Sequence, residues 1–193
     1  MNVYNPARIG KLITGRFSGD HSVYEYDSDK VIKFSKIDFF LGFQNALKKT
    51  IADQERCTQF FGEYLVPTEN VLSPEGRRVA LIQPLIRGRS FAKEDMREAD
   101  IRRQFLDIME RYQAMIASGS PRIDLVGHEG LFKGRFGNMF ITPERRLLIF
   151  DTTSVDFARS LLGKIFMYPL VKLFLWIQNN IVEKYQKEVR MWK

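Results

Sequence analysis

The stretch FGNMFITPERRLLIFDTT, residues 136–153, contains two short apolar runs separated by a polar turn. Asn138 lies at the start of the first run, and Asp151 lies at the end of the second. This pattern predicts a β-hairpin that holds one amide and one carboxylate at the same end of two paired strands. Such oxygen ligands suit a divalent cation bound to phosphate oxygens, whereas turn capping is the structural alternative for both residues.

The first 85 residues have the pattern of a β-sheet with one helix. Period-2 alternation and turn-rich connections predict strands at 9–17, 23–26, 31–34, 69–72 and 78–83. Residues 38–62 have helical composition, with apolar side chains on plausible inward positions. We therefore expect five antiparallel strands and one helix in this half of the chain.

Residues 86–193 are expected to be mainly helical apart from the hairpin. An amphipathic helix is indicated by one apolar stripe: Ile101, Phe105, Ile108, Tyr112 and Met115. From about residue 160 the chain again has a helical pattern, with an expected interruption at Pro169. The predicted fold class is therefore α+β, with a sheet-rich unit over 1–85 and a helical unit over 86–193.

Composition narrows the classes of partner. The net charge of +7 favours polyanions such as nucleotides or an anionic membrane surface. The basic residues are dispersed, and no zinc-finger spacing or aromatic-basic RNA motif is present, which argues against nucleic-acid binding. The single cysteine, Cys57, leaves no internal disulfide and indicates a reducing, cytoplasmic compartment, with peripheral membrane association as an alternative.

The order of these motifs resembles the protein-kinase-like superfamily, especially its small bacterial members related to aminoglycoside phosphotransferases and lipopolysaccharide kinases. Gly15 and Gly19, followed by Val23, resemble the phosphate-covering loop and the residue that packs on adenine. Lys33 in the motif VIK resembles the third-strand lysine that holds the α- and β-phosphates. Glu55 lies on the following helix, where the family places the carboxylate partner of that lysine.

The resemblance extends into the second half of the chain. The segment QPLIRG, residues 83–88, resembles the hinge that binds the adenine edge, with Gln83 and Leu85 as contacts. Asn138 and Asp151 match the two metal-holding positions, at the usual separation. The resemblance therefore implies a two-lobed fold that binds ATP and Mg²⁺ in a cleft between the lobes.

The catalytic base is the main departure from the family pattern. The family's aspartate lies five positions before the loop asparagine, and Lys133 occupies that position here. A lysine cannot accept the proton of a hydroxyl but can bind phosphate as a point charge. Residues of the same loop that could act as the base from another position are Asp124, His128 and Glu129. Glu129 fits best, because the sequence GHE resembles the family's His-x-Asp.

These features leave two enzymatic hypotheses. One is a pseudokinase or an atypical phosphoryl or nucleotidyl transferase that binds ATP and Mg²⁺. The other is an active small-molecule or lipid-headgroup kinase with Glu129 as its base.

A third hypothesis is an interaction module that binds a membrane surface or a protein partner through residues 161–193. The apolar run 161–177 contains Lys164, Lys172 and Pro169 and is short for a bilayer span, so core helices are the main alternative. Trp176 and the basic tail favour binding to a membrane surface.

Overall fold

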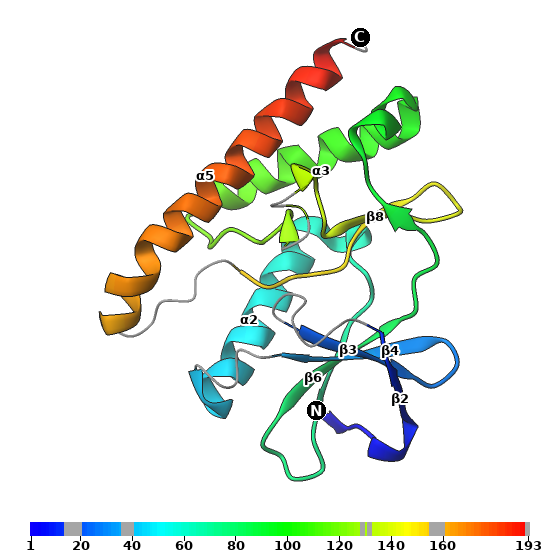
Figure 1. Cartoon of the computed structure of the whole chain (residues 1–193), viewed down its shortest axis with the longest axis vertical. Helices are drawn as coiled ribbons and strands as arrows, with labels where there is room; N and C mark the ends of the chain where they lie inside the picture. The colour runs from blue at the N-terminus through cyan, green and yellow to red at the C-terminus, as the bar shows by residue number, and fades with distance from the viewer. Residues whose placement is uncertain (14–20, 36–40, 128–129, 131–132, 155–160, 192–193) are drawn as a thin grey trace. The chain divides into compact units, whose positions relative to one another are not determined.

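The computed structural model describes residues 1–13, 21–35, 41–127, 130, 133–154 and 161–191, and it divides the chain into two compact units (Figure 1). The first unit comprises Met1–Glu55 and Val66–Ile86, and the second comprises Arg56–Leu65 and Arg87–Lys193. Residues 56–65, which lie within the expected N-terminal half, belong to the second unit.

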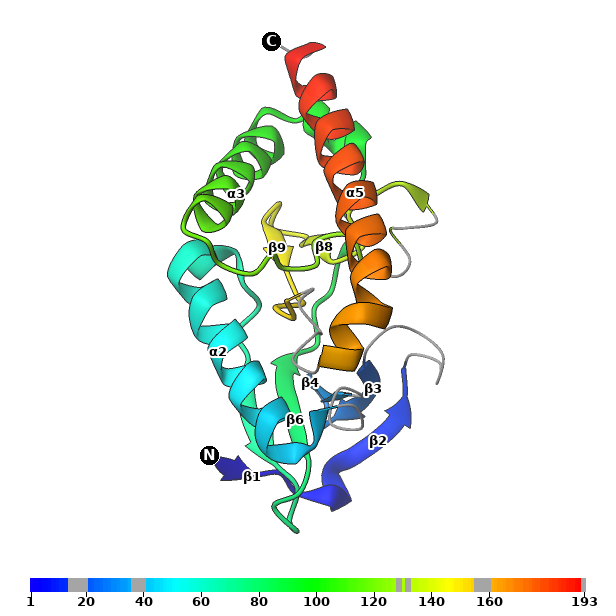
Figure 2. The ribbon, with the colours of Figure 1, turned by 90° about the vertical axis from the view of Figure 1, so that its left-hand side faces the viewer.

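Within the described residues, the first unit contains a six-stranded sheet in the order β1-β5-β6-β4-β3-β2 (Figure 2). Its strands are β1 (Asn2–Val3), β2 (Ile9–Leu12), β3 (His21–Tyr26), β4 (Lys30–Ser35), β5 (Glu69–Leu72) and β6 (Val79–Pro84). β1 pairs parallel with β5, and the other neighbours are antiparallel. The expectation of five antiparallel strands is therefore wrong, because a two-residue strand leaves no periodic pattern in the sequence.

The strand register separates two faces of this sheet. One face packs a small core: Tyr4, Tyr26, Ile32, Val71, Ala80 and Ile82. On the other face, Val23, Lys33 and Leu81 stand opposite one another on β3, β4 and β6. Directly opposed residues of antiparallel strands project to the same side, so these three side chains form one row across the sheet.

Helix α2 (Phe43–Phe61) carries a buried stripe at helical spacing: Ala46, Lys49, Asp53 and Cys57. The two charged members form an ion pair, with Lys49 Nζ 2.6 Å from Asp53 Oδ2. Gln54 attaches this helix to the chain before β5, because its Nε2 donates to Thr68 O at 2.7 Å. Its Oε1 also accepts a hydrogen bond from Asn70 on β5.

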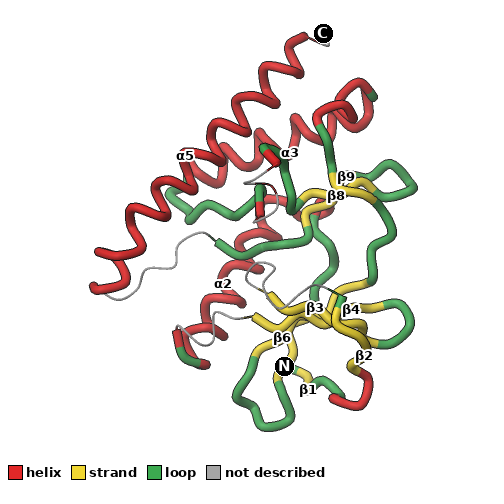
Figure 3. The backbone as a smooth tube through the Cα atoms, viewed as in Figure 1, coloured by secondary structure: helices red, strands yellow, loops and turns green. Residues whose placement is uncertain are grey.

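The second unit combines two long helices with a small sheet (Figure 3). Its elements are η2 (Gly62–Tyr64), β7 (Arg89–Ser90), η3 (Lys93–Arg97), α3 (Ala99–Ala117), β8 (Met139–Ile141), β9 (Leu147–Ile149) and α5 (Leu161–Met191), while η1 (Pro6–Arg8) lies in the first unit. The predicted stripe of α3 is buried as expected. Phe91, Phe105, Phe136 and Tyr185 form an aromatic cluster in the core, with ring centroids 4.7–6.2 Å apart.

Helix α5 continues past Pro169 as one helix of 31 residues, so the expected interruption is wrong. A proline inside a helix removes one backbone hydrogen bond, a local cost that burial elsewhere along the helix can offset. The C-terminal half supplies that burial through Ile181, Val182, Tyr185 and Val189, all in the core. Within the described residues, no helix has both the length and the apolar character needed to cross a membrane.

Candidate functional site

The predicted hairpin is formed by β8 and β9, with Met139 opposite Ile149 and Ile141 opposite Leu147. Phe150 N–H donates to Asn138 O at 3.2 Å and extends this pairing by one step. Asn138 therefore immediately precedes β8, and Asp151 lies just beyond β9. The register places both residues at the same open end of the hairpin.

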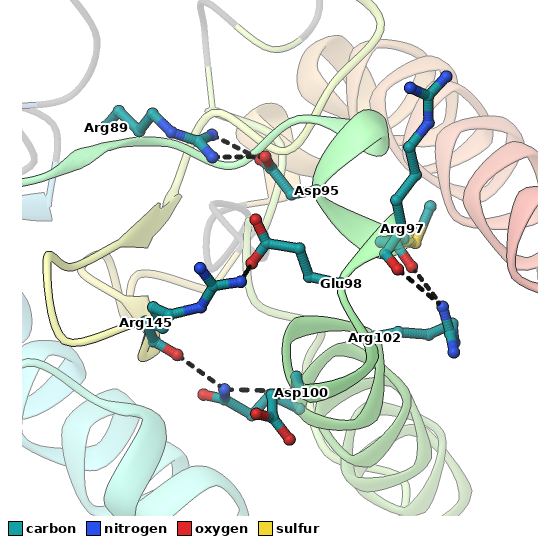
Figure 4. A network of polar contacts seen from close by, with 9 residues as sticks. Arg89, Asp95, Arg97, Glu98, Asp100, Arg102 and Arg145 are labelled. Carbon is teal, nitrogen blue, oxygen red and sulfur yellow. Dashed lines mark hydrogen bonds and ion pairs between the residues drawn. The ribbon is translucent and has the colours of Figure 1, made fainter.

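The turn end of the hairpin is anchored to the start of α3 (Figure 4). Arg145 adopts a positive φ of 62° in the turn, and its guanidinium pairs with Glu98, the residue that precedes α3. Gln104 donates to Arg145 O at 2.9 Å and accepts from Leu147 N–H at 2.8 Å. These contacts fix the orientation of the two strands and, through them, the residues at the open end.

Asn138 is buried and held on three sides. Its Nδ2 donates to Asp124 O at 2.8 Å, and its backbone N–H donates to Leu125 O at 3.2 Å. Its Oδ1 lies against Gly127, where a Cβ would stand only 2.5 Å away. Because Gly127 also has φ +64°, a side chain there would be strained and would displace the amide.

Asp124 occupies a tight turn that connects it to the hairpin. Its Oδ1 accepts from the N–H groups of Val126 at 2.9 Å and Gly127 at 2.7 Å. Its own N–H donates to Thr153 O at 3.2 Å, and Thr153 N–H donates to Asp151 Oδ1 at 2.9 Å. Asp124, Asn138 and Asp151 are thus linked through hydrogen bonds, and we name these three residues the acidic-amide cluster.

The acidic-amide cluster offers carboxylate and amide oxygens, the hard donors that Mg²⁺ prefers. Among the residues that the structure describes, no three His, Cys, Asp or Glu side chains form a group that could hold a metal ion. Asn138 and Asp151 would give such a cation two protein oxygens. Mg²⁺ commonly binds in that way, through one or two protein carboxylates.

The residues predicted to contact nucleotide in the first unit lie on the sheet and at its end. Lys33 is 8% exposed and stands beside Val23 in the row described above. Gln83 is also buried, and its Nε2 donates to Thr68 Oγ1 at 2.7 Å. Leu85 follows β6 and is exposed, with its N–H bonded to Asp29 O at 2.7 Å.

Glu55, the predicted partner of Lys33, lies on the exposed side of α2. The buried carboxylate in this part of the helix is Asp53, which the sequence reasoning overlooked. The sequence feature that could have indicated Asp53 is its spacing from Lys49. The two residues are four positions apart, on the same helical face as Ala46 and Cys57.

Several predicted residues of the phosphate and base sites lie outside the described residues. They are Gly15, Gly19, His128 and Glu129. Lys133 is described and exposed. Asp124, the alternative base that is described, accepts a hydrogen bond from Asn138 Nδ2 at its backbone oxygen.

Gln178 is a second residue that the sequence reasoning missed. It lies on α5, is fully buried and contacts the backbone on both sides of Asp124. The sequence offered one indication of this role. Gln178 is a single polar residue on the apolar stripe that continues through Ile181, Val182 and Tyr185.

No protein-family model matches the chain, and a comparison with curated protein sequences found no match. Solved structures do match. The Legionella pneumophila Lpg2603 kinase bound to IP6 has a TM-score of 0.50 and 17% identity, over 90% of this chain and 59% of that protein. PpkA-294 in its apo form has a TM-score of 0.54 and 15% identity, over 89% of this chain and 66% of that protein.

The chain thus spans about three fifths to two thirds of the length of these proteins. At such low identity the similarity concerns the fold, which extends over nearly the whole chain. The chain has a protein-kinase-like fold.

Proposed function

We propose that this chain is a phosphotransferase that binds ATP with Mg²⁺ and uses Asp124 as its base. The observation that carries the proposal is the acidic-amide cluster, in which Asn138 donates to Asp124 O at 2.8 Å. Asn138 and Asp151 would hold the cation, and Asp124 would orient the acceptor hydroxyl and receive its proton. Lys33 would contribute positive charge to the phosphates.

The choice of Asp124 follows from what a base requires. In phosphoryl transfer to a hydroxyl the usual base is a carboxylate, and it must be held in a fixed direction near the reacting groups. The N–H groups of Val126 and Gly127 fix the Asp124 carboxylate, and the bond from Asn138 fixes its backbone. Under this proposal Lys133 contacts phosphate and does not replace the base. The separation between the base and Asn138 is then longer than the five positions usual in the family.

Nucleotide binding is tested first, because it needs no acceptor substrate. Wild-type protein should be stabilised by Mg-ATP, by about 2.7 kcal/mol at a nucleotide concentration of 100 times Kd. Lys33→Met should weaken ATP binding through loss of a phosphate contact, and Asp151→Asn should remove its Mg²⁺ dependence. Isothermal titration with and without Mg²⁺ measures both, and absence of binding to wild type at millimolar nucleotide refutes the proposal.

The base is tested with Asp124→Asn, which retains an oxygen acceptor for Val126 and Gly127 but cannot take up a proton. We expect ATP turnover to fall by about 10²–10⁴-fold, with Mg-ATP affinity unchanged. Glu129→Gln is the comparison variant, since Glu129 is the competing base. If Glu129→Gln abolishes turnover while Asp124→Asn does not, the assignment of Asp124 is wrong. If wild type binds ATP and shows no turnover with any acceptor, the chain is a pseudokinase.

A second function, binding to an anionic membrane surface, is favoured by the exposed face of α5. Tyr168, Leu173 and Trp176 are between 53% and 61% exposed, and Lys172 Nζ lies 4.5 Å from the Tyr168 ring centroid. Exposed aromatic and aliphatic side chains beside lysine are typical of helices at a lipid interface. The acceptor substrate of such a protein would then include lipid headgroups.

Point variants are the suitable test of membrane binding, because the C-terminal half of α5 belongs to the core and its removal would unfold the unit. Wild type should sediment with vesicles of phosphatidylserine and phosphatidylcholine, and Leu173→Ser with Trp176→Ser should abolish this. Leu106→Ser, at an exposed apolar residue of α3, is the matched control and should still sediment. Equal binding of wild type and the double variant would exclude this face.

A further inference from the structure

We infer that Gln178 on α5 is a positioning residue for the acidic-amide cluster. The inference deepens the proposed function and rests on it, because it assigns a distant helix a role in that same site. Gln178 has no exposed surface, although it carries a polar amide. A side chain used only for packing at this position would be apolar, because burying an amide costs free energy unless all its groups are bonded.

All the hydrogen-bonding groups of Gln178 are used. Its Nε2 donates to Ile123 O at 3.1 Å and to Tyr112 Oη at 2.5 Å. Its Oε1 accepts from Leu125 N–H at 3.3 Å. A glutamine amide has two N–H donors and one acceptor oxygen, so both donors and the oxygen have partners.

Two of these partners flank Asp124. Holding Ile123 O and Leu125 N–H fixes the peptide groups on both sides of this residue, and with them the direction of its carboxylate. The adjacent carbonyls, Asp124 O and Leu125 O, are the acceptors of the Asn138 side chain and backbone. A shift of the backbone at 123–125 would therefore move both carbonyl oxygens that accept hydrogen bonds from Asn138.

The same face of α5 also contacts the chain just before Asn138. Tyr185 lies two helical turns beyond Gln178, and its ring meets Phe136 edge-on at 4.7 Å. Burial raises the pKa of Tyr185 to about 12, while the backbone amide of Phe136 acts to lower it. Helix α5 thus contacts the backbone before Asp124 and the residue near Asn138, and Gln178 supplies the directional contact.

Tyr112 completes the arrangement from α3. Burial raises the pKa of its hydroxyl, and the hydrogen bond from Gln178 acts in the opposite direction, as expected for an oxygen that accepts from the amide. Tyr112 therefore orients the Gln178 side chain.

The test compares Gln178→Met with Val182→Ala. Methionine keeps the approximate volume of glutamine and removes its hydrogen bonds, whereas Val182 is a buried residue of α5 whose truncation leaves a cavity. The first readout is amide hydrogen exchange at Leu125 and Asn138, normalised to global stability from urea unfolding. The second is the affinity for Mn²⁺ in the presence of ADP, measured by electron paramagnetic resonance.

Gln178→Met should accelerate exchange at both amides beyond its effect on global stability, and should weaken Mn²⁺ binding by about 10- to 100-fold. Val182→Ala should change neither after normalisation. If the two variants change exchange and Mn²⁺ affinity in parallel with stability, Gln178 is merely structural and the inference is wrong. Normal Mn²⁺ affinity in a folded Gln178→Met protein also overturns it.

The experiment also distinguishes failure of the proposed function from failure of the Gln178→Met variant to fold. If wild type binds neither Mn²⁺ nor nucleotide, the proposed function fails, and the exchange data alone decide whether Gln178 orders the backbone around Asp124. If Gln178→Met does not fold, Tyr112→Phe removes one partner of Gln178 while retaining the aromatic ring. That variant should give the same selective exchange at Leu125, to a smaller extent, and unchanged exchange overturns the inference.

Discussion

The two units each bury a polar group on a helix, and the two groups differ in kind. In the first unit, Lys49 and Asp53 on α2 form a charged pair four residues apart on the same helix. In the second unit, Gln178 on α5 is neutral and bonds to residues more than 50 positions away. The ion pair between Lys49 and Asp53 joins two neighbours on α2, whereas the hydrogen bonds of Gln178 join segments that are far apart in the sequence. The comparison shows that a neutral buried amide can connect distant parts of the chain without any charge.

The largest expected effect comes from breaking the charged pair. Asp53→Ala leaves the Lys49 ammonium buried without this carboxylate and should destabilise the protein by about 3–5 kcal/mol. Urea unfolding followed by circular dichroism measures the change. The double variant Lys49→Met with Asp53→Leu removes both charges and should recover most of the loss. A double variant as unstable as Asp53→Ala would mean that the pair itself, and not the isolated charge, carries the effect.

The next effect tests how closely Gly127 fits against Asn138 in the acidic-amide cluster. Gly127→Ala should destabilise by about 1–2 kcal/mol through left-handed backbone strain, and should also displace Asn138 and weaken Mn²⁺ binding. Gly119→Ala is the matched control, because Gly119 has φ +76° and no atom near its added Cβ. It should show the strain alone. Equal loss of Mn²⁺ affinity in both variants would contradict the close contact between Gly127 and Asn138.

A smaller, pH-dependent effect is expected at Asp95, which pairs with the half-exposed Arg89. Burial raises the pKa of Asp95, but hydrogen bonds from Arg89 and Ala92 outweigh it and lower the pKa overall. The pair therefore stabilises the fold above the unfolded pKa of about 3.9, and this contribution is lost as pH falls through the folded value. Its size should be about 1 kcal/mol or less.

Asp95→Asn should accordingly flatten the acid limb of a stability profile measured between pH 7 and 2. The neutral contacts of Gln178 carry no such dependence. If Asp95→Asn leaves the acid limb unchanged, other carboxylates account for it.

The smallest effect is expected for the exposed pair of Arg103 and Asp100 on α3. Their side chains are 80% and 68% exposed, and such pairs contribute little because water screens them. Arg103→Ala should change the free energy of unfolding by less than about 0.5 kcal/mol. A larger change in the free energy of unfolding would show that this exposed pair contributes more to stability than solvent screening allows.

Local patterns in the sequence were sufficient for most of the elements. Alternation at 23–26 and 31–34 predicted β3 and β4, and the stripe from Ile101 to Met115 predicted α3, because burial of one face imposes a period on the sequence. Strand β1 was not predicted, because two residues are too few to show a period. The interruption predicted at Pro169 was wrong, because packing along the rest of α5 outweighs the local effect of the proline.

Within the candidate site, the sequence predicted that Asn138 and Asp151 lie at the same end of one hairpin, as the register has them. Asn138 and Asp151 share a hairpin, so their placement at one end follows from its strands. Counting back from Asn138 gives Lys133, whereas the hydrogen bond of the Asn138 side chain leads to the backbone of Asp124, the base that we propose. The length of a loop does not determine which of its residues returns to the strand. Gln178 could not be assigned from sequence, since its partners come from α3 and the 123–125 backbone.

The two-residue strand β1 has a further consequence for behaviour in solution. Together with β2 it forms the edges of the described first sheet. β1 is brief and is followed by Pro6, and β2 has an irregular register between Ile9 and Leu12. Short, proline-flanked or irregular edges give an incoming strand few regularly spaced backbone groups. Lengthening β1 by replacing Pro6 would therefore be expected to promote edge-to-edge association and fibril formation.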